Sequence, residues 1–322
     1  MNHEYKSIFK DIINDLINEK RKLGYKYKTE ARHLKNFDTF AYNLNVCDFN
    51  LSKDIVDKYV EIKPWEKPIN ATNRVQVIRE LARYLNRVGY SAYVLPPLPK
   101  GSYTSDFIPH IFSDDEIKRL FEAVDKWSTS PSLDNQYYKE RLKYPLIIRI
   151  LYSTGMRIGE VLSLKVENID FENNTFTILN AKNHSERIIP VHKNIIKIIK
   201  DYLDDMNIFK TDDYIFQGEI KEIHLKSSTV NQQFLKFLMM AKIPHFKDGP
   251  RIHDLRHTFC VCRLKLWVKE GRDINALFPY LCAYMGHVDT RCTEYYLRLT
   301  SDLYPDIVFK SERYLYGEEN ER

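Results

Sequence analysis

The chain has 322 residues, 43% of them hydrophobic and 29% charged, which is typical of a globular protein long enough for two domains. No stretch approaches the roughly 18 consecutive apolar residues of a membrane span, and the N-terminal residues lack the apolar core of a secretory signal, so we expect a cytoplasmic protein with no membrane partner. The net charge is +5, and residues 1–100 carry 18 Lys and Arg against 12 Asp and Glu. This excess is compatible with binding of a phosphate backbone, although a solvated surface gives the same pattern more often.

The first third of the chain predicts a small all-helical domain. Apolar residues recur every three or four positions from Tyr5 to Ile17, as on the buried face of an amphipathic helix, and Gly24 follows as a stop signal. Residues 95–102 hold three prolines and a glycine, which exclude a helix and indicate a linker. We place this domain, with its linker, at residues 1–103. Its other predicted helices cover residues 29–45, 52–62 and 70–88.

Residues 104–322 form the second predicted domain, which is mainly α-helical around a small β-hairpin or sheet. Ser113 and Glu116 have the spacing of a capping box and mark the start of a helix. The β-branched stretches 175–179 and 187–191 flank a polar turn and predict the two strands of the hairpin. Helical patterns cover residues 144–164, 194–203, 228–241, 253–270 and 273–285.

The cysteines do not predict a zinc site or a redox motif. They form an odd set in apolar surroundings, and no two of them are spaced as Cys-x-x-Cys. We therefore expect reduced thiols in the core. The five cysteines are Cys47, Cys260, Cys262, Cys282 and Cys292.

The first of four chemical signals in the second domain surrounds an arginine. Residues 154–160 read Thr-Gly-Met-Arg-Ile-Gly-Glu, and the glycines beside Arg157 allow a backbone or a phosphate to approach closely. A single arginine in such a place is far more often on the solvent-facing side of a helix. Glu160 either orients Arg157 or forms an ordinary surface pair with it.

The other three signals follow in chain order. Lys182 stands in the turn of the hairpin, where a flexible ammonium can reach into a groove and donate a proton, although most hairpin lysines are simply solvated. His253 and Arg256 are three positions apart, on one face of a helix near its N-terminus, which is a good location for binding an anion. A Gly-His pair at 286–287 is followed, nine residues after the histidine, by Tyr296.

In this order, the signals resemble the catalytic domain of the tyrosine recombinase, or phage-integrase, family. That domain shows Thr-Gly-x-Arg-x-x-Glu, a hairpin lysine, His-x-x-Arg, Leu/Met-Gly-His and then a nucleophilic tyrosine. The resemblance spans roughly residues 112–299 and includes the segment Glu-Arg-Ile-Ile-Pro-Val at 186–191. The helical first domain resembles the family's core-DNA-binding domain in architecture only. A two-domain, C-shaped clamp is therefore the expected fold.

The resemblance also implies a role for each matching residue. Arg157 and Arg256 would hold the scissile phosphate, because planar guanidinium groups suit the negative charge that gathers on its oxygens in the transition state. The other implied roles are phosphate contacts from His253 and His287, proton donation by Lys182, nucleophilic attack by Tyr296, and support of Arg157 by Glu160.

Two adjacent tyrosines compete for the role of nucleophile. Tyr295 and Tyr296 cannot both face the phosphate, because neighbouring helical residues point about 100° apart. The family's spacing from the Gly-His pair selects Tyr296. A free tyrosine with a pKa of ~10 is mostly protonated at neutral pH, so it needs a base or a cationic field, and His253 or His287 could assist it.

The resemblance further implies the partners and cofactors. The energy of the broken bond is retained in a covalent 3′-phosphotyrosyl link, so no metal or nucleotide cofactor is expected. The expected partner is double-stranded DNA at specific recombination sites in a bacterial nucleoid. Two duplexes with two protomers each imply a homotetramer in the synaptic complex, and the tail 302–322 is a candidate to pack on the neighbouring protomer.

Two readings from other classes compete with a recombinase. His253 and His257 fit the His-x-x-x-His pattern of a zinc hydrolase, but no third ligand is evident and Arg256 would repel a dication. The second competing hypothesis is a DNA-binding accessory protein that lacks catalytic activity. The presence of chemically competent residues at every catalytic position of the family argues against it.

The biological role is less sharply indicated than the chemistry. The Lys-, Asn- and Ile-rich composition suggests an AT-rich bacterial genome. We favour integration and excision of a mobile element, with chromosome-dimer resolution by the same chemistry as the alternative.

Overall fold

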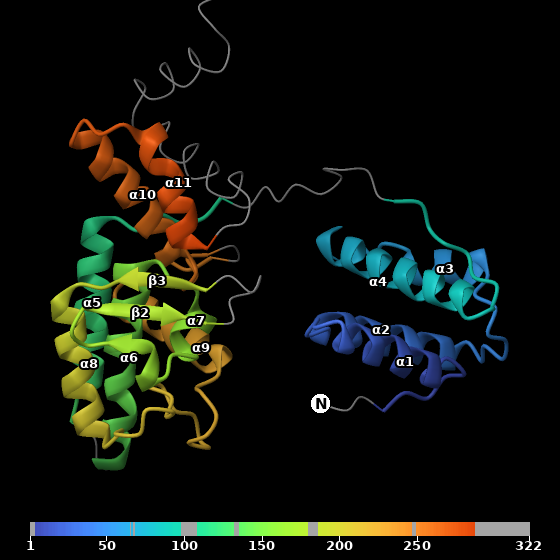
Figure 1. Cartoon of the computed structure of the whole chain (residues 1–322), viewed down its shortest axis with the longest axis horizontal. Coiled ribbons are helices and arrows are strands. Elements are labelled where there is room, and N and C mark those ends of the chain that lie inside the picture. The colour runs from blue at the N-terminus through green and yellow to red at the C-terminus, as the bar shows by residue number, and fades with distance from the viewer. Residues whose placement is uncertain are drawn as a thin grey trace, which may run out of the picture. The chain divides into compact units, whose positions relative to one another are not determined.

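The chain divides into two compact units, residues 1–106 and 107–322, each of which is described by itself. A computed structural model describes most of both units (Figure 1). The described residues are 4–64, 66, 68–97, 108–131, 135–179, 186–246 and 249–286. The predicted tail, 302–322, lies outside them.

The first unit is built from helices in its described part, as the periodicity predicts. Their apolar faces pack into one core in which Phe9, Leu34, Phe37 and Leu81 are completely buried. The helices are α1 (Lys10–Lys22), α2 (Lys28–Asn43), α3 (Lys53–Val60) and α4 (Pro68–Arg87).

Helix α1 begins later than the apolar pattern suggests. The buried carboxylate of Asp38, on α2, accepts hydrogen bonds from the backbone N–H groups of Lys6 and Ser7 at 2.8 and 2.9 Å, and from the Ser7 hydroxyl at 2.7 Å. These bonds hold the segment before Lys10 in a turn. Tyr5 and Ile8 therefore contribute to the core without belonging to the helix.

The second unit is mainly helical with one small antiparallel sheet in its described part. Ser113 and Glu116 form the predicted capping box, which is confirmed at the start of the first helix. Its helices are α5 (Asp114–Thr129), α6 (Asn135–Thr154), α7 (Ile158–Leu162), η1 (Val166–Asn168, a 3₁₀ turn), α8 (Lys193–Met206), α9 (Ser227–Met240), α10 (Asp254–Lys269) and α11 (Ile274–Met285).

The sheet has the strand order β1 (Ile169–Asp170), β2 (Thr175–Ile178), β3 (Arg187–Pro190). The predicted hairpin is β2 and β3, and β1 was missed because two residues are too few to show an alternating pattern. Phe176 pairs with Ile189, and both side chains are completely buried. This face of the sheet therefore anchors the hairpin to the helical core.

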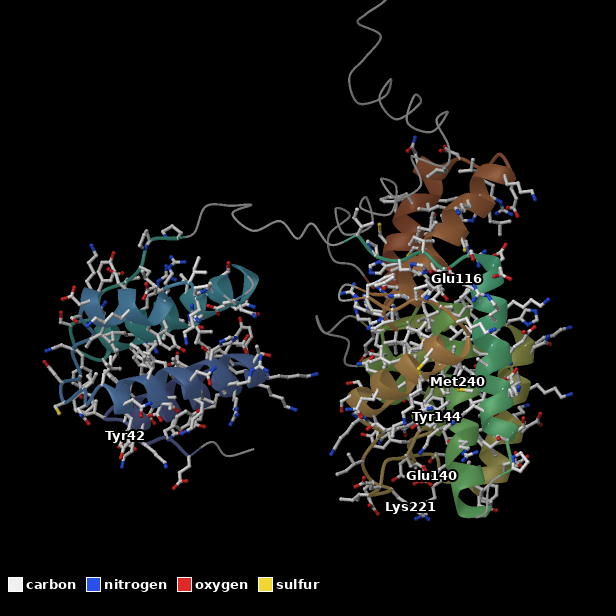
Figure 2. All side chains as sticks on the ribbon, turned by 180° about the vertical axis from the view of Figure 1, so that it is seen from behind. Tyr42, Glu116, Glu140, Tyr144, Lys221 and Met240 are labelled. Carbon is white, nitrogen blue, oxygen red and sulfur yellow. The ribbon has the colours of Figure 1, made fainter. Side chains whose placement is uncertain are left out.

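The core of the second unit surrounds α6. Ile147, Ile148 and Ile150 are all fully buried, so this helix is covered on several faces rather than along a single stripe. Figure 1 shows α6 among α5, α8 and the sheet, and side chains fill the space between the helices of each unit (Figure 2). A smaller cluster, which includes Phe259, Leu264 and Leu281, joins α10 to α11.

The helix predicted over residues 144–164 is wrong in two respects, because α6 begins earlier, at Asn135, and because the helix is interrupted. Helix α6 ends at Thr154 and α7 begins at Ile158, with Gly155 between them at a φ of +62°. A Cβ at Gly155 would lie 2.5 Å from Cδ1 of Phe259, so only glycine fits against that ring. Packing against α10 therefore decides where the helix breaks.

The cysteines also depart from expectation at one position. Cys260 and Cys282 are buried and Cys262 is half-buried, but Cys47 is exposed, since it lies in the loop after α2. The four cysteines in the described ranges are all free thiols, and Cys292 lies outside those ranges. None of the described helices is both long enough and apolar enough to span a bilayer.

Candidate active site

The break between α6 and α7 positions Arg157 and Glu160 together. Arg157 is the N-cap of α7, and its backbone N–H donates to Glu160 Oε2 at 3.0 Å. Its Nη1 also donates to Glu160 Oε1 at 2.9 Å. The Arg157 side chain keeps 30% of its surface exposed, whereas that of Glu160 keeps 9%. The pair is therefore a largely buried carboxylate holding an arginine that still reaches solvent.

A second arginine, Arg187 of β3, binds the same carboxylate. Its Nη2 lies 2.8 Å from Glu160 Oε2 and its Nη1 lies 3.2 Å from Oε1, so the two groups meet fork to fork. Burial would raise the pKa of Glu160, but the hydrogen bonds from Arg187 and Arg157 outweigh it and hold that pKa below its ordinary value. Glu160 is therefore an anion at neutral pH.

Arg256, in the first turn of α10, is buried to 2% exposure. Its Nη1 donates to the carbonyl oxygen of Gly155 at 2.7 Å, and its Nη2 donates to that of Met285 at 2.6 Å. One guanidinium thus joins the break between α6 and α7 to the end of α11.

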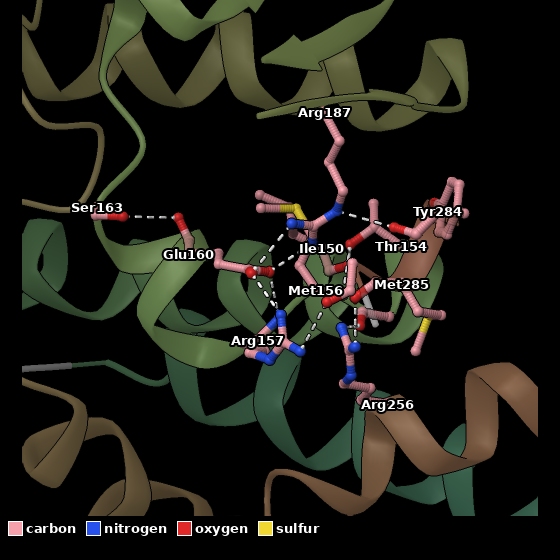
Figure 3. Close-up of polar contacts among 12 residues, drawn as sticks. Ile150, Thr154, Met156, Arg157, Glu160, Ser163, Arg187, Arg256, Tyr284 and Met285 are labelled. Carbon is pink, nitrogen blue, oxygen red and sulfur yellow. Dashed lines mark hydrogen bonds and ion pairs between the residues drawn. The ribbon is translucent and has the colours of Figure 1, made fainter. Parts of the chain in front are cut away.

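The three arginines converge on the C-terminal end of α11 (Figure 3). Arg187 Nε donates to the Tyr284 carbonyl at 2.9 Å, Arg256 binds the Met285 carbonyl, and Arg157 Nη2 reaches the Gly286 carbonyl at 3.3 Å. Carbonyls at the end of a helix lack partners within the helix and carry its partial negative charge, so cations are favoured there. Residues from β3, from the N-cap of α7 and from α10 are thereby brought to one point.

His253 is the N-cap of α10 and lies at the surface beside this cluster. Partial loss of hydration, with the charges of His257 and Arg256 adding to it, lowers the pKa of His253 to about 4. Its imidazole is therefore neutral at pH 7 and can accept a hydrogen bond. The ring borders an open hollow of about 360 Å³ that is also lined by Ile158 and Arg251.

The structure brings together the predicted residues that it describes. Arg157, Glu160 and Arg256 share the cluster at the end of α11, and His253 is one turn from Arg256. Glu160 is not part of an ordinary surface pair, because it is largely buried. The predicted residues Lys182, His287 and Tyr296, and the competing Tyr295, lie outside the described residues.

Sequence reasoning missed Arg187. The sequence assigns the segment 186–191 to a strand and to the family resemblance without a role for Arg187, although the alternation of a strand places Arg187 on the same face as the buried Ile189. An arginine on an inward face requires a buried acid or carbonyl groups to bind. That rule would have pointed to a partner for Arg187 without identifying it as Glu160.

The two histidines of the hydrolase reading do lie close together, with ring centroids 5.0 Å apart. In the described ranges, no third His, Cys, Asp or Glu joins them in a group able to hold a metal ion. Arg256 lies between them in the sequence, in the first turn of the same helix. This arrangement suits an anion better than a dication.

A family model described as the phage integrase family matches residues 111–302, which is more than half of the chain. The chain belongs to this family. As a member of these tyrosine recombinases it is an enzyme that breaks and rejoins DNA strands.

Curated relatives support this membership. The chain is 24% identical over 322 residues to the protein named "Putative integrase/recombinase y4rB" of Sinorhizobium fredii, a match that covers 95% of this chain and 98% of that protein. It is also 29% identical over 210 residues to the tyrosine recombinase XerA of Pyrococcus furiosus, which covers 64% of this chain and 61% of that protein.

Solved structures of integrases and recombinases share the fold. The XerH site-specific recombinase, crystallised with a palindromic difH substrate after cleavage, matches with a TM-score of 0.60 at 21% identity and covers 83% of this chain and 74% of its own. The Tn1549 transposon integrase bound to transposon right-end DNA matches with a TM-score of 0.56 at 15% identity and covers 88% and 94%.

Proposed function

We propose that this phage integrase family member is a site-specific DNA recombinase that uses Tyr296 as its nucleophile. The phenol oxygen forms a bond to the scissile phosphorus, the bond from phosphorus to the 5′-oxygen breaks, and the DNA is left joined through a 3′-phosphotyrosyl link. The 5′-hydroxyl of another strand then reverses the step. The observation that carries the proposal is the convergence of Arg157 and Arg256 at the end of α11, one residue before His287.

The arginine cluster suits a phosphodiester in the transition state. Negative charge gathers on the non-bridging oxygens as the tyrosine attacks, and preorganised guanidinium groups stabilise it without rearrangement. Arg157 supplies an accessible guanidinium, while the buried Arg256 fixes the backbone that surrounds it. Loss of one such donor typically slows a reaction by ~100-fold to 1,000-fold.

Proton transfers complete the proposed step. A neutral His253, with its pKa lowered to about 4, can accept a hydrogen bond from the attacking phenol. Because it is a weak base, it takes the phenol proton only as the bond to phosphorus forms and makes that proton strongly acidic. Lys182 would protonate the departing 5′-oxygen, and His287 would add a contact to the phosphate. The phosphotyrosyl link conserves the energy of the broken bond, so we propose chemistry without a metal or a nucleotide cofactor.

The proposed partner is double-stranded DNA, with the helical first domain, residues 1–103, as a core-binding domain and residues 104–322 as the catalytic domain. Among structures of the same fold, XerH is recorded bound to a difH substrate, and the lambda integrase is recorded as a tetramer on a Holliday junction. We therefore propose a homotetramer of this chain in the synaptic complex, with the tail 302–322 packed on the neighbouring protomer.

Integration and excision of a mobile element is the biological role that we favour. The match to y4rB, whose name includes integrase, covers 98% of that protein, whereas the match to XerA covers 61%. Resolution of chromosome dimers is the second candidate because of the Xer relatives. Trapping covalent complexes in the host cell and sequencing the linked DNA ends distinguishes them, since one role yields element ends and the other a single chromosomal site.

The nucleophile is tested on a nicked suicide duplex that carries a site selected from a random library by binding. We expect the unaltered protein to form a covalent adduct, Tyr296→Phe to form none, and Tyr295→Phe, the matched control, to retain it. Mass spectrometry of the adduct identifies the linked residue. An adduct with Tyr296→Phe would remove our nucleophile, the absence of any adduct would favour an accessory role, and loss of activity with EDTA would favour the hydrolase.

A further inference from the structure

We propose that Arg187 is a positioning residue for the recombinase reaction, which keeps Arg157 available to the DNA phosphate. This inference rests on the proposed function, because it assumes that Arg157 contacts the phosphate. Arg187 itself is a poor candidate for substrate contact, since its side chain is 9% exposed while that of Arg157 is 30% exposed.

The two arginines make unequal numbers of side-chain hydrogen bonds to the Glu160 carboxylate. Arg187 binds both carboxylate oxygens through Nη1 and Nη2, whereas the side chain of Arg157 binds only Oε1 through Nη1. A lone carboxylate and a lone guanidinium prefer the fork-to-fork geometry. Because Arg187 holds that position, Arg157 does not turn its own fork toward Glu160.

The charges of the cluster lead to the same conclusion. Two arginines around one ionised carboxylate leave a net charge of about +1, which attracts a phosphodiester. Without Arg187, Arg157 and Glu160 would form a neutral pair, leaving the buried Arg256, whose Nη atoms bind backbone carbonyls, as the cation of the cluster. Arg187 therefore offsets the negative charge of Glu160, so that the positive charge of Arg157 remains available to the phosphate.

Arg187 also fixes the segment that leads toward His287. Its Nε donates to the Tyr284 carbonyl at 2.9 Å, and a Cβ at Gly286 would lie 3.0 Å from its Nη1. Gly286 adopts a φ of +64° and is the C-cap of α11. One guanidinium thus packs against the end of α11 and holds the acid that orients Arg157.

The test compares adduct formation on two suicide substrates, one with an ordinary scissile phosphate and one with a methylphosphonate. The methylphosphonate carries no negative charge, so it needs little stabilisation from Arg157. We expect Arg187→Gln to slow adduct formation by ~100-fold on the phosphate and by less than about tenfold on the methylphosphonate. Arg187→Lys, which keeps the charge but loses the fork, should slow the reaction on the phosphate less than Arg187→Gln does. Arg272→Lys, which alters an exposed ion pair with Glu270, should change neither rate.

A double-variant cycle provides an independent readout. If Arg187 acts through Glu160, then adding Arg187→Gln to Glu160→Gln should slow the reaction on the phosphate by less than about tenfold more. This double variant also leaves no buried carboxylate without its arginine, so it remains informative if Arg187→Gln alone does not fold. Thermal unfolding of each variant shows whether that variant is folded.

The inference and the proposed function fail in different ways. Equal losses on both substrates, or additive losses in the cycle, would show a merely structural role for Arg187, and an unchanged rate on the phosphate would show no role. An unaltered protein that forms no adduct on either substrate would instead refute the proposed function.

Discussion

At the scale of single residues, the site depends on how buried charge is balanced. Glu160 remains ionised because Arg187 and Arg157 both bind it, and their hydrogen bonds outweigh the effect of burial on its pKa. Arg256 is held by backbone carbonyls of Gly155 and Met285. Each cation is thus positioned by groups that are themselves fixed by packing.

The titration of His257 gives a prediction at this scale. Burial, with Arg251 and Arg256 adding to it, lowers the pKa of His257 to about 4, whereas an unfolded chain protonates this histidine near 6.5. Between these values the unfolded state binds more protons, so stability is full above about pH 6.5 and is lost as pH falls toward 4.

We expect the free energy of unfolding to fall by up to about 3 kcal/mol over this window through His257 alone. Urea unfolding at several pH values should give a shallower dependence for His257→Gln than for the unaltered protein. Parallel curves that differ only by a constant offset would contradict the prediction.

At the scale of elements, the joint between α6 and α7 decides the geometry of the site. The joint turns at Gly155, whose carbonyl binds Arg256 and whose Cα faces the ring of Phe259. Phe259 in turn stacks on Tyr284 with ring centroids 5.6 Å apart. A change at the joint is therefore transmitted to both α10 and α11.

The two glycines around Arg157 provide a matched pair of variants. Gly155→Ala would place a Cβ 2.5 Å from Phe259 in a left-handed conformation, so we expect it to lower the free energy of unfolding by about 3 kcal/mol. Gly159→Ala meets no atom within 4 Å at a helical position and should be neutral or stabilise by up to about 1 kcal/mol. Urea unfolding measures both, and similar effects would contradict the role assigned to the joint.

At the scale of the whole molecule, each unit has its own hydrophobic core. The cluster around Phe37 belongs to residues 1–106, and the clusters around Ile148 and Phe259 belong to residues 107–322. Separate cores are the property that allows domains to fold alone. The catalytic chemistry and the proposed DNA-binding helices can therefore be tested apart.

We expect residues 107–322, expressed alone, to unfold in one cooperative transition and to form the covalent adduct. Because the fragment lacks the basic first unit, its affinity for the DNA site should be lower by ~100-fold or more. Circular dichroism and gel-shift titration measure the two properties. A fragment that does not fold would show that the units depend on each other.

The sequence by itself determined the family and most of the elements. The apolar periodicity, the Ser113–Glu116 capping box and the β-branched strands are local patterns, so they can be recognised without a fold. It also selected Arg157, Glu160 and Arg256 as members of one site, because the order of the motifs carries that information.

Only the tertiary structure decided what those residues bind. The break at Gly155 is set by Phe259, 104 positions along the chain, and the fork between Arg187 and Glu160 joins residues 27 positions apart. Hydrogen bonds between distant side chains depend on how the elements pack, and packing has no local signature in the sequence. The pattern therefore indicated which residues carry the chemistry, while the fold determined which atoms hold them in place.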